Sequence, residues 1–345
     1  INENSILYTN KKDKLKLINF IKSINLNKKD IFLSCNMREL YNSFFLMKIS
    51  KINFILKNIL LHPEEYKYSS SLSLNPKKQI FYNKSLLTKM DKNDLNIYPN
   101  QNFRNETYGK ELSEKDFFPF PVENVKHNLK NKEINPSKID LLTISRFVNF
   151  KISTTLSLIT FVKKNKNFTL NIVGYGPWKF LINIFLFFFK SKRIKVYPKQ
   201  NPEDLKLFIE NCDIGFAQGT TILQIAKFKK PVVVAPYSKW YDFILKKIKS
   251  PQVFGDTKFP DFGDIYYKEN LGYHDYKDLF DKVVLNYSDF VSQTEDMLSI
   301  LETDKIFTSL LIKLKEPKYF QDYENIIFPK PSFFKTIIRK ILYSI

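Results

Sequence analysis

The chain has 345 residues, enough for two domains that each bury a core of their own. Its hydrophobic content of 43%, with 16% aromatic residues, excludes an intrinsically disordered chain. The formal net charge of +20 predicts attraction to anions such as nucleotide phosphates, acidic glycans or lipid headgroups.

Lysine carries most of this charge, because only five of the 55 cationic residues are arginine. A gene biased toward A and T would also encode such a blend of lysine, asparagine, isoleucine and phenylalanine. We find no element that concentrates arginine and lysine with interleaved aromatic residues, so the composition argues against nucleic-acid binding.

The two cysteines, Cys35 and Cys212, lie in apolar segments and predict buried thiols in a reducing compartment. The longest apolar run, 180–189, is shorter than the roughly 20 residues that span a bilayer, and Asn183 interrupts it. No signal peptide opens the chain, so we expect a cytoplasmic protein. Because the chain starts at Ile1 without a methionine, we expect a fragment or an incomplete gene.

The first half alternates apolar and amphipathic stretches. Strands are predicted at 6–9, 30–35, 52–61 and 80–82, and helices at 11–24, 37–48 and 85–90. The polar segment 123–137, which ends in Asn-Pro-Ser, is typical of a linker. We therefore expect an amino-terminal domain at 1–130, a second domain at 131–320 and a carboxyl-terminal basic helix at 321–345.

The second half alternates more regularly. The predicted strands are 139–144, 168–173, 194–197, 213–217 and 231–235, and the predicted helices are 153–164, 177–189, 202–211, 220–228, 276–286, 288–302 and 304–314. Strands separated by helices of about ten residues favour an α/β fold with a doubly wound parallel sheet.

Two cations follow the first of these strands. Arg146 comes two residues after its end, and Lys151 lies five residues further on. A guanidinium and an ammonium at the carboxyl end of a strand can bind a diphosphate, although a solvated pair on a loop is the alternative.

Glycines follow two other strands. Gly174 and Gly176 let the backbone approach a ligand, or form a tight turn without one. Lys179 stands where the dinucleotide-binding fingerprint requires a third glycine. The Gly219-Thr220-Thr221 turn opens a helix, and N–H groups at such a position can hold an anion.

Taken in order, these motifs resemble the nucleotide-sugar-binding domain of GT-B glycosyltransferases, and most closely the family-four enzymes of bacterial surface-polysaccharide assembly. The resemblance covers about residues 139–237 and extends more loosely over 61–66 and 80–122. It rests on the segments Ile144-Ser145-Arg146, Val173-Gly174-Tyr175-Gly176-Pro177, Cys212-Asp213-Ile214-Gly215, Gly219-Thr220-Thr221 and Lys230-Pro231-Val232.

The resemblance implies two Rossmann-like domains facing a cleft, of which the amino-terminal one looks incomplete. It implies that Arg146, Lys151 and the Gly219-Thr220-Thr221 turn bind the donor diphosphate. Gln224 matches a carboxylate that usually binds the donor ribose, and Gly174, Gly176 and Tyr197 would lie near the nucleoside. A packed aromatic residue is the other interpretation of Tyr197.

The implied reaction transfers a sugar from a nucleoside diphosphate to a hydroxyl of a glycan or lipid-linked acceptor. Enzymes of the GT-A class hold a metal with an Asp-x-Asp triplet, which this chain lacks. We therefore expect no obligatory metal and no cofactor, and the resemblance implies retention of anomeric configuration.

On the acceptor side, His62 is the candidate catalytic residue, with Glu64, Asn36 and Arg38 as candidate acceptor-binding residues. A strand-end histidine with a purely structural hydrogen bond is the alternative. The apolar and basic segment 332–343 could rest on an anionic membrane or pack back across the domains.

Three other functions remain open. Because Gln224 brings no charge, the chain could be a catalytically inactive GT-B module that binds nucleotide or glycan as a partner subunit. It could also be a nucleotide-sugar 2-epimerase, or a basic peripheral membrane or nucleic-acid protein whose sheet is only a scaffold.

Overall fold

A computed structural model describes residues 23, 31–53, 55–59, 76–98, 118–122, 134–188, 190–238, 240–244, 251–256, 260, 262–263, 276–315 and 319–320. The chain forms two compact α/β units, with Ile1–Pro119 and Phe307–Ile345 in unit 1 and Phe120–Ile306 in unit 2. The division therefore falls before the predicted linker 123–137. It also differs from the predicted boundaries because the chain returns to unit 1 at Phe307.

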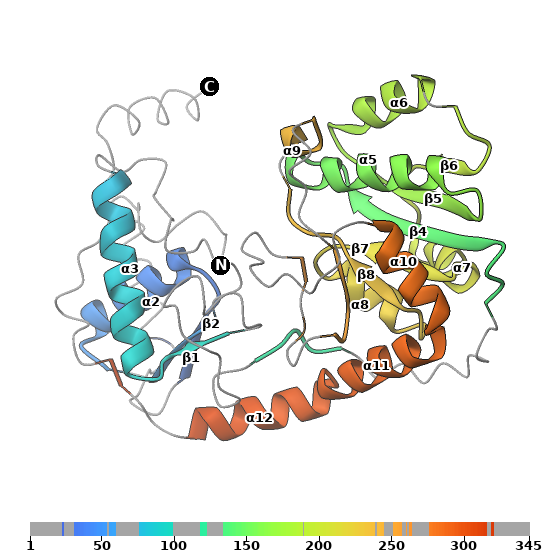
Figure 1. Ribbon diagram of the computed structural model, residues 1–345. Helices are drawn as coiled ribbons and strands as arrows, with labels where there is room; N and C mark the ends of the chain where they lie inside the picture. The colour runs from blue at the N-terminus through green and yellow to red at the C-terminus, as the bar shows by residue number, and fades with distance from the viewer. Residues whose placement is uncertain are drawn as a thin grey trace. The chain divides into compact units, whose positions relative to one another are not determined.

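The described part of unit 1 contains a parallel three-stranded sheet in the order β1-β2-β3 (Figure 1). Its elements are β1 (Ile31–Ser34), α2 (Met37–Ser50), β2 (Ile55–Ile59), α3 (Pro76–Lys92) and β3 (Asn96–Ile97). The central strand β2 is buried at every position, as expected of a parallel strand that is covered on both faces.

The predicted strand at 80–82 was wrong, because this stretch belongs to α3, whereas the predicted helix at 85–90 is confirmed as part of the same helix. Asn83, Leu86, Leu87 and Met90 are buried at helical spacing, and the buried Asn83 accepts a hydrogen bond from the Tyr41 hydroxyl at 2.7 Å. Pro76 occupies the first helical position, where its missing N–H costs nothing. The short strand β3 was not predicted.

Unit 2 holds a six-stranded sheet in the order β6-β5-β4-β7-β8-β9. All neighbours pair in parallel except β8 and β9, which are antiparallel. Its strands are β4 (Ile139–Arg146), β5 (Phe168–Tyr175), β6 (Ile194–Tyr197), β7 (Ile214–Ala217), β8 (Val232–Val234) and β9 (Gln252–Val253). This arrangement confirms the predicted doubly wound sheet, to which the structure adds β9.

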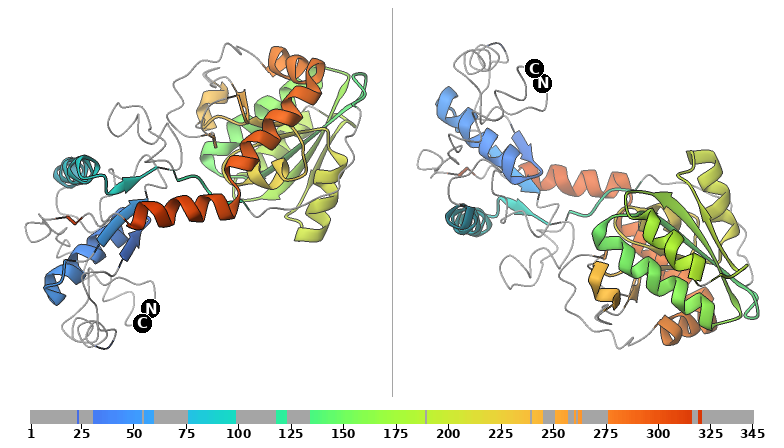
Figure 2. Two further views of the ribbon diagram at one scale, coloured as in Figure 1. Left: turned by 90° about the horizontal axis from the view of Figure 1, so that it is seen from below. Right: turned by 90° about the horizontal axis from the view of Figure 1, so that it is seen from above.

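The described helices of this unit cover both faces of the sheet. They are α5 (Asn149–Lys164), α6 (Lys179–Phe188), α7 (Pro202–Asn211), α8 (Thr221–Ala226), α9 (Trp240–Ile244), α10 (Tyr276–Leu285) and α11 (Tyr287–Ile300). Helices α5 and α6 lie on one face, and α7 and α8 lie on the other (Figures 1 and 2). Helix α12 (Thr303–Lys315) contains the boundary between the two units.

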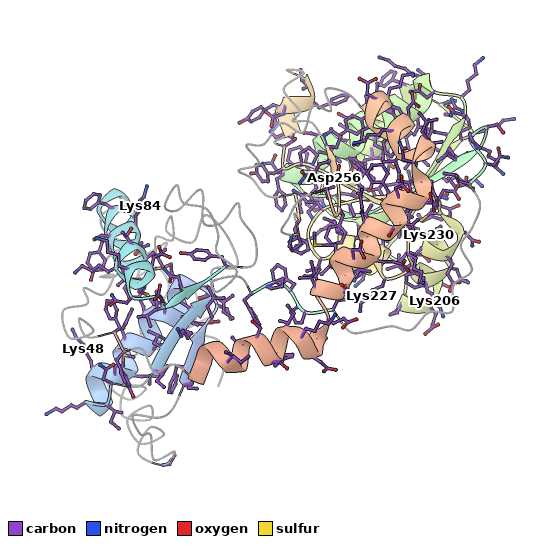
Figure 3. The ribbon with its side chains drawn as sticks, turned by 60° about the horizontal axis from the view of Figure 1, so that its bottom comes forward. Lys48, Lys84, Lys206, Lys227, Lys230 and Asp256 are labelled. Atoms are coloured by element: carbon purple, nitrogen blue, oxygen red, sulfur yellow. The ribbon has the colours of Figure 1, made fainter. Side chains whose placement is uncertain are left out.

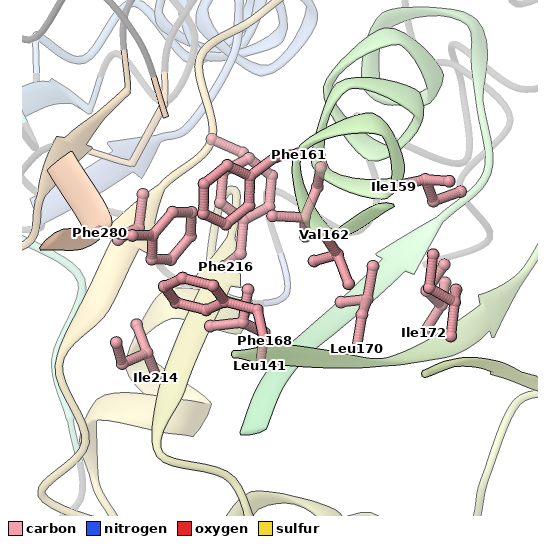
Figure 4. Close-up of a cluster of buried hydrophobic side chains, with 14 of the residues drawn as sticks. Leu141, Ile159, Phe161, Val162, Phe168, Leu170, Ile172, Ile214, Phe216 and Phe280 are labelled. Atoms are coloured by element: carbon pink, nitrogen blue, oxygen red, sulfur yellow. The ribbon is translucent and has the colours of Figure 1, made fainter. Parts of the chain in front are cut away.

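Successive residues of the central strand β4 belong to hydrophobic cores on opposite faces of the sheet. Leu141 joins a cluster with Phe161, Phe168 and Phe280 (Figure 4), whereas Leu142 belongs to the cluster on the opposite face. The Phe161 and Phe280 rings stack with their centroids 4.9 Å apart. Burial on both faces explains why β7 and β8 are apolar throughout.

Neither cysteine forms a disulfide, as predicted, but only Cys212 is buried, whereas Cys35 is half-buried. Exposed lysines project from helices of both units, including Lys48 on α2, Lys84 on α3 and Lys206 on α7 (Figure 3). The positive charge is thus spread over many elements. Among the described residues no helix combines the length and apolar character needed to cross a membrane.

Candidate functional site

The candidate site lies at the carboxyl edge of the unit 2 sheet. Strand β4 lies between β5 and β7, and all three run in the same direction. Arg146, the last residue of β4, is in register with Tyr175 at the end of β5. The segments that follow these strands therefore leave the sheet at one edge, as the motif order predicted.

Lys151 connects two of these segments. Its Nζ atom donates a hydrogen bond to the backbone oxygen of Gln218, at 3.4 Å, from the first turn of α5. Burial lowers the pKa of Lys151, and the positive charge of Arg146 lowers it further. The two cations and the turn after β7 are thus within electrostatic reach of one another.

Gly219 gives the turn its shape. It has a φ of +73°, which glycine adopts at little cost, and a Cβ built on it would meet no atom within 4 Å. Its own N–H donates to the Phe262 oxygen at 2.7 Å and is therefore already used. The N–H groups of Thr220 and Thr221 find no backbone acceptor in the part of the chain that the structure describes.

Helix α8 is shorter than the predicted helix 220–228, since it contains only Thr221–Ala226. Lys229 adopts a left-handed conformation with φ of +56°, and its N–H bonds to the Ala226 oxygen at 2.8 Å, which ends the helix ahead of Pro231. A helix of six residues has a weak dipole. Local N–H groups and side-chain cations therefore supply the positive potential at this edge.

Gly174 and Gly176 serve the packing of β5 against the chain that leaves β4. A Cβ on Gly174 would lie 1.9 Å from the Ser145 oxygen, and one on Gly176 would lie 2.4 Å from the Phe147 oxygen. Phe147 is fully buried beneath them. The absence of side chains at both glycines is thus explained without a ligand.

Tyr197 and Gln224 differ in exposure. The Tyr197 ring packs edge-on against Phe208 of α7, with a centroid distance of 4.6 Å, and contacts the core of that face. This is the packed arrangement that the sequence left open. Gln224 is exposed on α8, where its amide can reach solvent or a ligand.

The residues predicted for the acceptor side belong to unit 1. Asn36 is the N-cap of α2, and its side-chain oxygen accepts a hydrogen bond from the Glu39 N–H at 3.0 Å. Arg38 lies in the first turn of this helix. His62 and Glu64 lie outside the described residues, as does the segment 332–343.

Sequence reasoning missed the segment that supports the Gly219 turn. Gln218 donates through Nε2 to the Gly263 oxygen, beside the bond from Gly219 to Phe262. Gly263 has a φ of +75°, and a Cβ there would lie 2.2 Å from the Ala235 oxygen. Since the chain has only eight glycines, the presence of one at 263 was the available signal.

The Gln218 side chain also leaves one atom without a partner. Its Oε1 is buried and has no hydrogen-bond partner among the described residues. Over the same ranges of the chain, no group of three or more His, Cys, Asp or Glu side chains is placed to hold a metal ion. The groups that the structure places at this edge are two cations, backbone N–H groups and amides.

No protein-family model and no curated protein sequence matches the chain. Solved structures do match, and they show that the chain has the fold of the GT-B glycosyltransferases. This confirms the predicted fold class.

Among these structures is the lipopolysaccharide outer core galactosyltransferase WaaB, with 13% identity and a TM-score of 0.56 over 90% of this chain and 83% of WaaB. Anabaena HepE in complex with UDP and glucose matches with 11% identity and a TM-score of 0.54, over 89% of this chain and 83% of HepE. S. aureus TarM in complex with UDP matches 87% of this chain with 16% identity and a TM-score of 0.51. This chain covers 58% of the length of TarM.

Proposed function

We propose that this chain transfers a sugar from a nucleoside diphosphate sugar to a hydroxyl of a glycan or lipid-linked acceptor. One observation carries the proposal. The contact from Lys151 to the Gln218 oxygen brings this cation to the turn after β7, and Arg146 at the end of β4 lies within electrostatic reach of Lys151. The similarity to HepE, solved with UDP and glucose, and to the galactosyltransferase WaaB supports this assignment.

The chemical task of such a site is to stabilise the charge that grows on the departing diphosphate. Arg146 can bind two phosphate oxygens at once, and Lys151 adds a second positive charge. The N–H groups of Thr220 and Thr221 donate to the same oxygens. Because these groups are fixed before the reaction, they stabilise the transition state more than the bound substrate.

These groups can do the work that a metal performs in enzymes with an Asp-x-Asp triplet. We accordingly propose a transferase without an obligatory metal or a cofactor, and one that retains anomeric configuration. Gln224, which is exposed on α8, would hydrogen-bond the ribose, with Tyr197 nearer the base. His62, with Glu64, would serve the acceptor hydroxyl.

Nucleotide protection tests the site. UDP or GDP at millimolar concentration should raise the melting temperature of the wild-type protein, whereas Arg146→Ala should abolish the increase. Lys163→Ala is the matched control, since this exposed lysine lies in the last turn of the same helix as Lys151. Equal protection of wild type and Arg146→Ala would contradict the proposal.

The neutral Gln224 favours one second candidate, an inactive module that binds nucleotide or glycan as a partner subunit. Release of nucleoside diphosphate from a panel of nucleotide sugars distinguishes the two. Turnover supports the transferase. The inactive module is supported if nucleotide protects the protein but no nucleotide sugar is turned over, and if Gln224→Glu does not gain activity.

The proposal includes a location. Lipid-linked acceptors lie at membrane surfaces, and the net charge of +20 favours anionic lipid. We therefore place the chain in the cytoplasm, associated peripherally with the inner face of the membrane.

A further inference from the structure

Helix α6 exposes an apolar face where most surface helices present polar residues. Its inner side chains Leu181, Ile182 and Phe185 pack toward the core. Its outer face carries Phe180, Ile184, Phe187 and Phe188, all exposed, with exposed fractions of 68% for Phe187 and 72% for Phe188. Apolar side chains gathered in this way mark an interaction surface.

Helix α9 extends this face. Trp240, Tyr241 and Ile244 are exposed on it. The Trp240 ring stacks on Trp178, just before α6, with centroids 6.0 Å apart, and Trp178 stacks in turn on Phe180 at 6.1 Å. The rings thus form a continuous path from α9 to α6, which we call the aromatic face.

The charge around the aromatic face is mainly positive, although one carboxylate, Asp242, lies on α9. Residues 141–202 contain nine lysines and two arginines but no aspartate or glutamate. Lys190 and Lys192 follow α6 and are exposed, and the Lys190 ammonium lies 5.7 Å from the centre of the Phe187 ring. Lysines beside exposed aromatic rings can keep their charge at an anionic surface while the rings enter an apolar phase.

We propose that the aromatic face docks on an anionic lipid bilayer, with Phe187 and Phe188 inserted among the acyl chains. Trp240 and Tyr241 would lie at the headgroup level, where aromatic residues with a polar atom are favoured. Lys190 and Lys192 would contact lipid phosphates. A bilayer matches this face because it supplies both an apolar layer and a diffuse negative charge. The cations of 141–202 outnumber Asp242, the one carboxylate on α9.

This proposal names the surface for the membrane association proposed above, and it links that surface to the donor site. Helix α6 begins three residues after Gly176, and the backbone of Gly176 lies against Phe147, directly after Arg146. A docked aromatic face would therefore hold this edge of the sheet near the headgroups. A lipid-linked acceptor would then meet the donor without leaving the membrane.

Tryptophan fluorescence of the full chain tests the docking directly, because Trp178 and Trp240 are the only two tryptophans. Vesicles of phosphatidylcholine and phosphatidylglycerol at 7:3 should shift the emission to shorter wavelength, and brominated acyl chains should quench it. Pure phosphatidylcholine vesicles should have a much weaker effect. Vesicle binding without a shift or quenching would overturn the proposal, as would the absence of binding.

Variants assign the effect to residues. Phe187→Ser with Phe188→Ser should lower the vesicle partition coefficient by about tenfold or more. Lys190→Gln with Lys192→Gln should lower it only where phosphatidylglycerol is present. Leu207→Ser with Leu285→Ser, exposed apolar residues on α7 and α10, should leave it unchanged.

These measurements separate docking from catalysis and from self-association. Nucleotide protection should be unchanged in the Phe187→Ser, Phe188→Ser variant, so a failed docking test leaves the donor site unaffected. Vesicle binding should be unchanged in Arg146→Ala, so a failed nucleotide test leaves the docking surface unaffected. Sedimentation without vesicles addresses a second copy of the chain as the occupant. A wild-type dimer that becomes monomeric in the phenylalanine variant would contradict docking on lipid.

Discussion

At the scale of single residues, Lys151 is the side chain on which the candidate site depends most. It is half-buried, it lies within electrostatic reach of the Arg146 cation, and its pKa is lowered by both circumstances. A bound diphosphate would reverse this effect, because two or more negative charges nearby favour the protonated amine. Binding should therefore be coupled to uptake of a proton.

This coupling predicts the pH dependence of nucleotide affinity. As pH rises from the lowered pKa of Lys151 toward the ordinary lysine value of 10.5, UDP affinity should fall, by about tenfold for each unit that binding moves the pKa. The terminal phosphate does not interfere, since it is already ionised above about pH 6. Calorimetric titration measures the effect, and Lys151→Arg should flatten it. A pH profile that is the same in both proteins would refute the coupling.

Two glycines with different surroundings give a second prediction. Gly174→Ala should lower the free energy of unfolding by about 3 kcal/mol, because its Cβ would overlap the Ser145 backbone oxygen. Gly219→Ala should cost only about 1 kcal/mol, because its Cβ meets open space and only the positive φ opposes it. Urea denaturation of both variants compares them. Equal losses of unfolding free energy in the two variants would mean that the close contact between Gly174 and Ser145 does not contribute to stability.

At the scale of elements, Arg193 secures the end of α5. Its Nη1 atom donates to the oxygens of Val162, Asn165 and Phe168, at 2.8, 2.6 and 2.9 Å, and Nη2 donates to the Lys163 oxygen at 3.2 Å. The last carbonyls of a helix lack partners within it, and one planar guanidinium here satisfies several of them.

We predict that Arg193→Ala lowers the free energy of unfolding by about 1.5 kcal/mol. Arg193→Lys should recover only part of this loss, because a single ammonium cannot reach all four carbonyls. Thermal or urea unfolding measures both variants, with the exposed neighbour Lys192→Ala as the control. Should Arg193→Ala match that control, the hydrogen bonds seen at this helix end would contribute nothing to stability.

At the scale of the whole molecule, the two ends of unit 2 meet. Val122 forms a parallel bridge with Glu302, donates its N–H to the Leu301 oxygen at 2.7 Å and accepts the Thr303 N–H at 3.1 Å. The donor-side residues Arg146, Lys151 and Gly219 all lie between these ends. Unit 2 thus has the features of a domain that folds alone.

A fragment of residues 120–306 should therefore fold cooperatively and keep the nucleotide protection of the full chain. Circular dichroism and calorimetry measure its folding, and the shift in melting temperature with UDP measures binding. Loss of binding in a folded fragment would place an essential donor contact in unit 1. An unfolded fragment would show that unit 2 depends on the rest of the chain.

Much of unit 2 was predictable from local pattern, because covered parallel strands are continuous apolar runs and their helices are amphipathic. Helix α7 occupies 202–211 as predicted, since Asn201 caps it and Pro202 begins it. The wrong predictions came from segments whose hydrophobic pattern is weak. The 80–82 strand and the overlong helix at 220 came from short apolar runs, whose period is ambiguous.

The sequence by itself determined which residues meet at the carboxyl edge of the unit 2 sheet, because the order of strands and the motifs between them place Arg146, Lys151 and the Gly219 turn at the ends of parallel strands. Only the tertiary structure decided what the other motifs do. Gly174 and Gly176 admit the backbone of 145–147, Tyr197 packs on Phe208, and α6 exposes an apolar outer face. The reason is that packing and exposure depend on contacts between segments far apart in the chain, which no local pattern encodes.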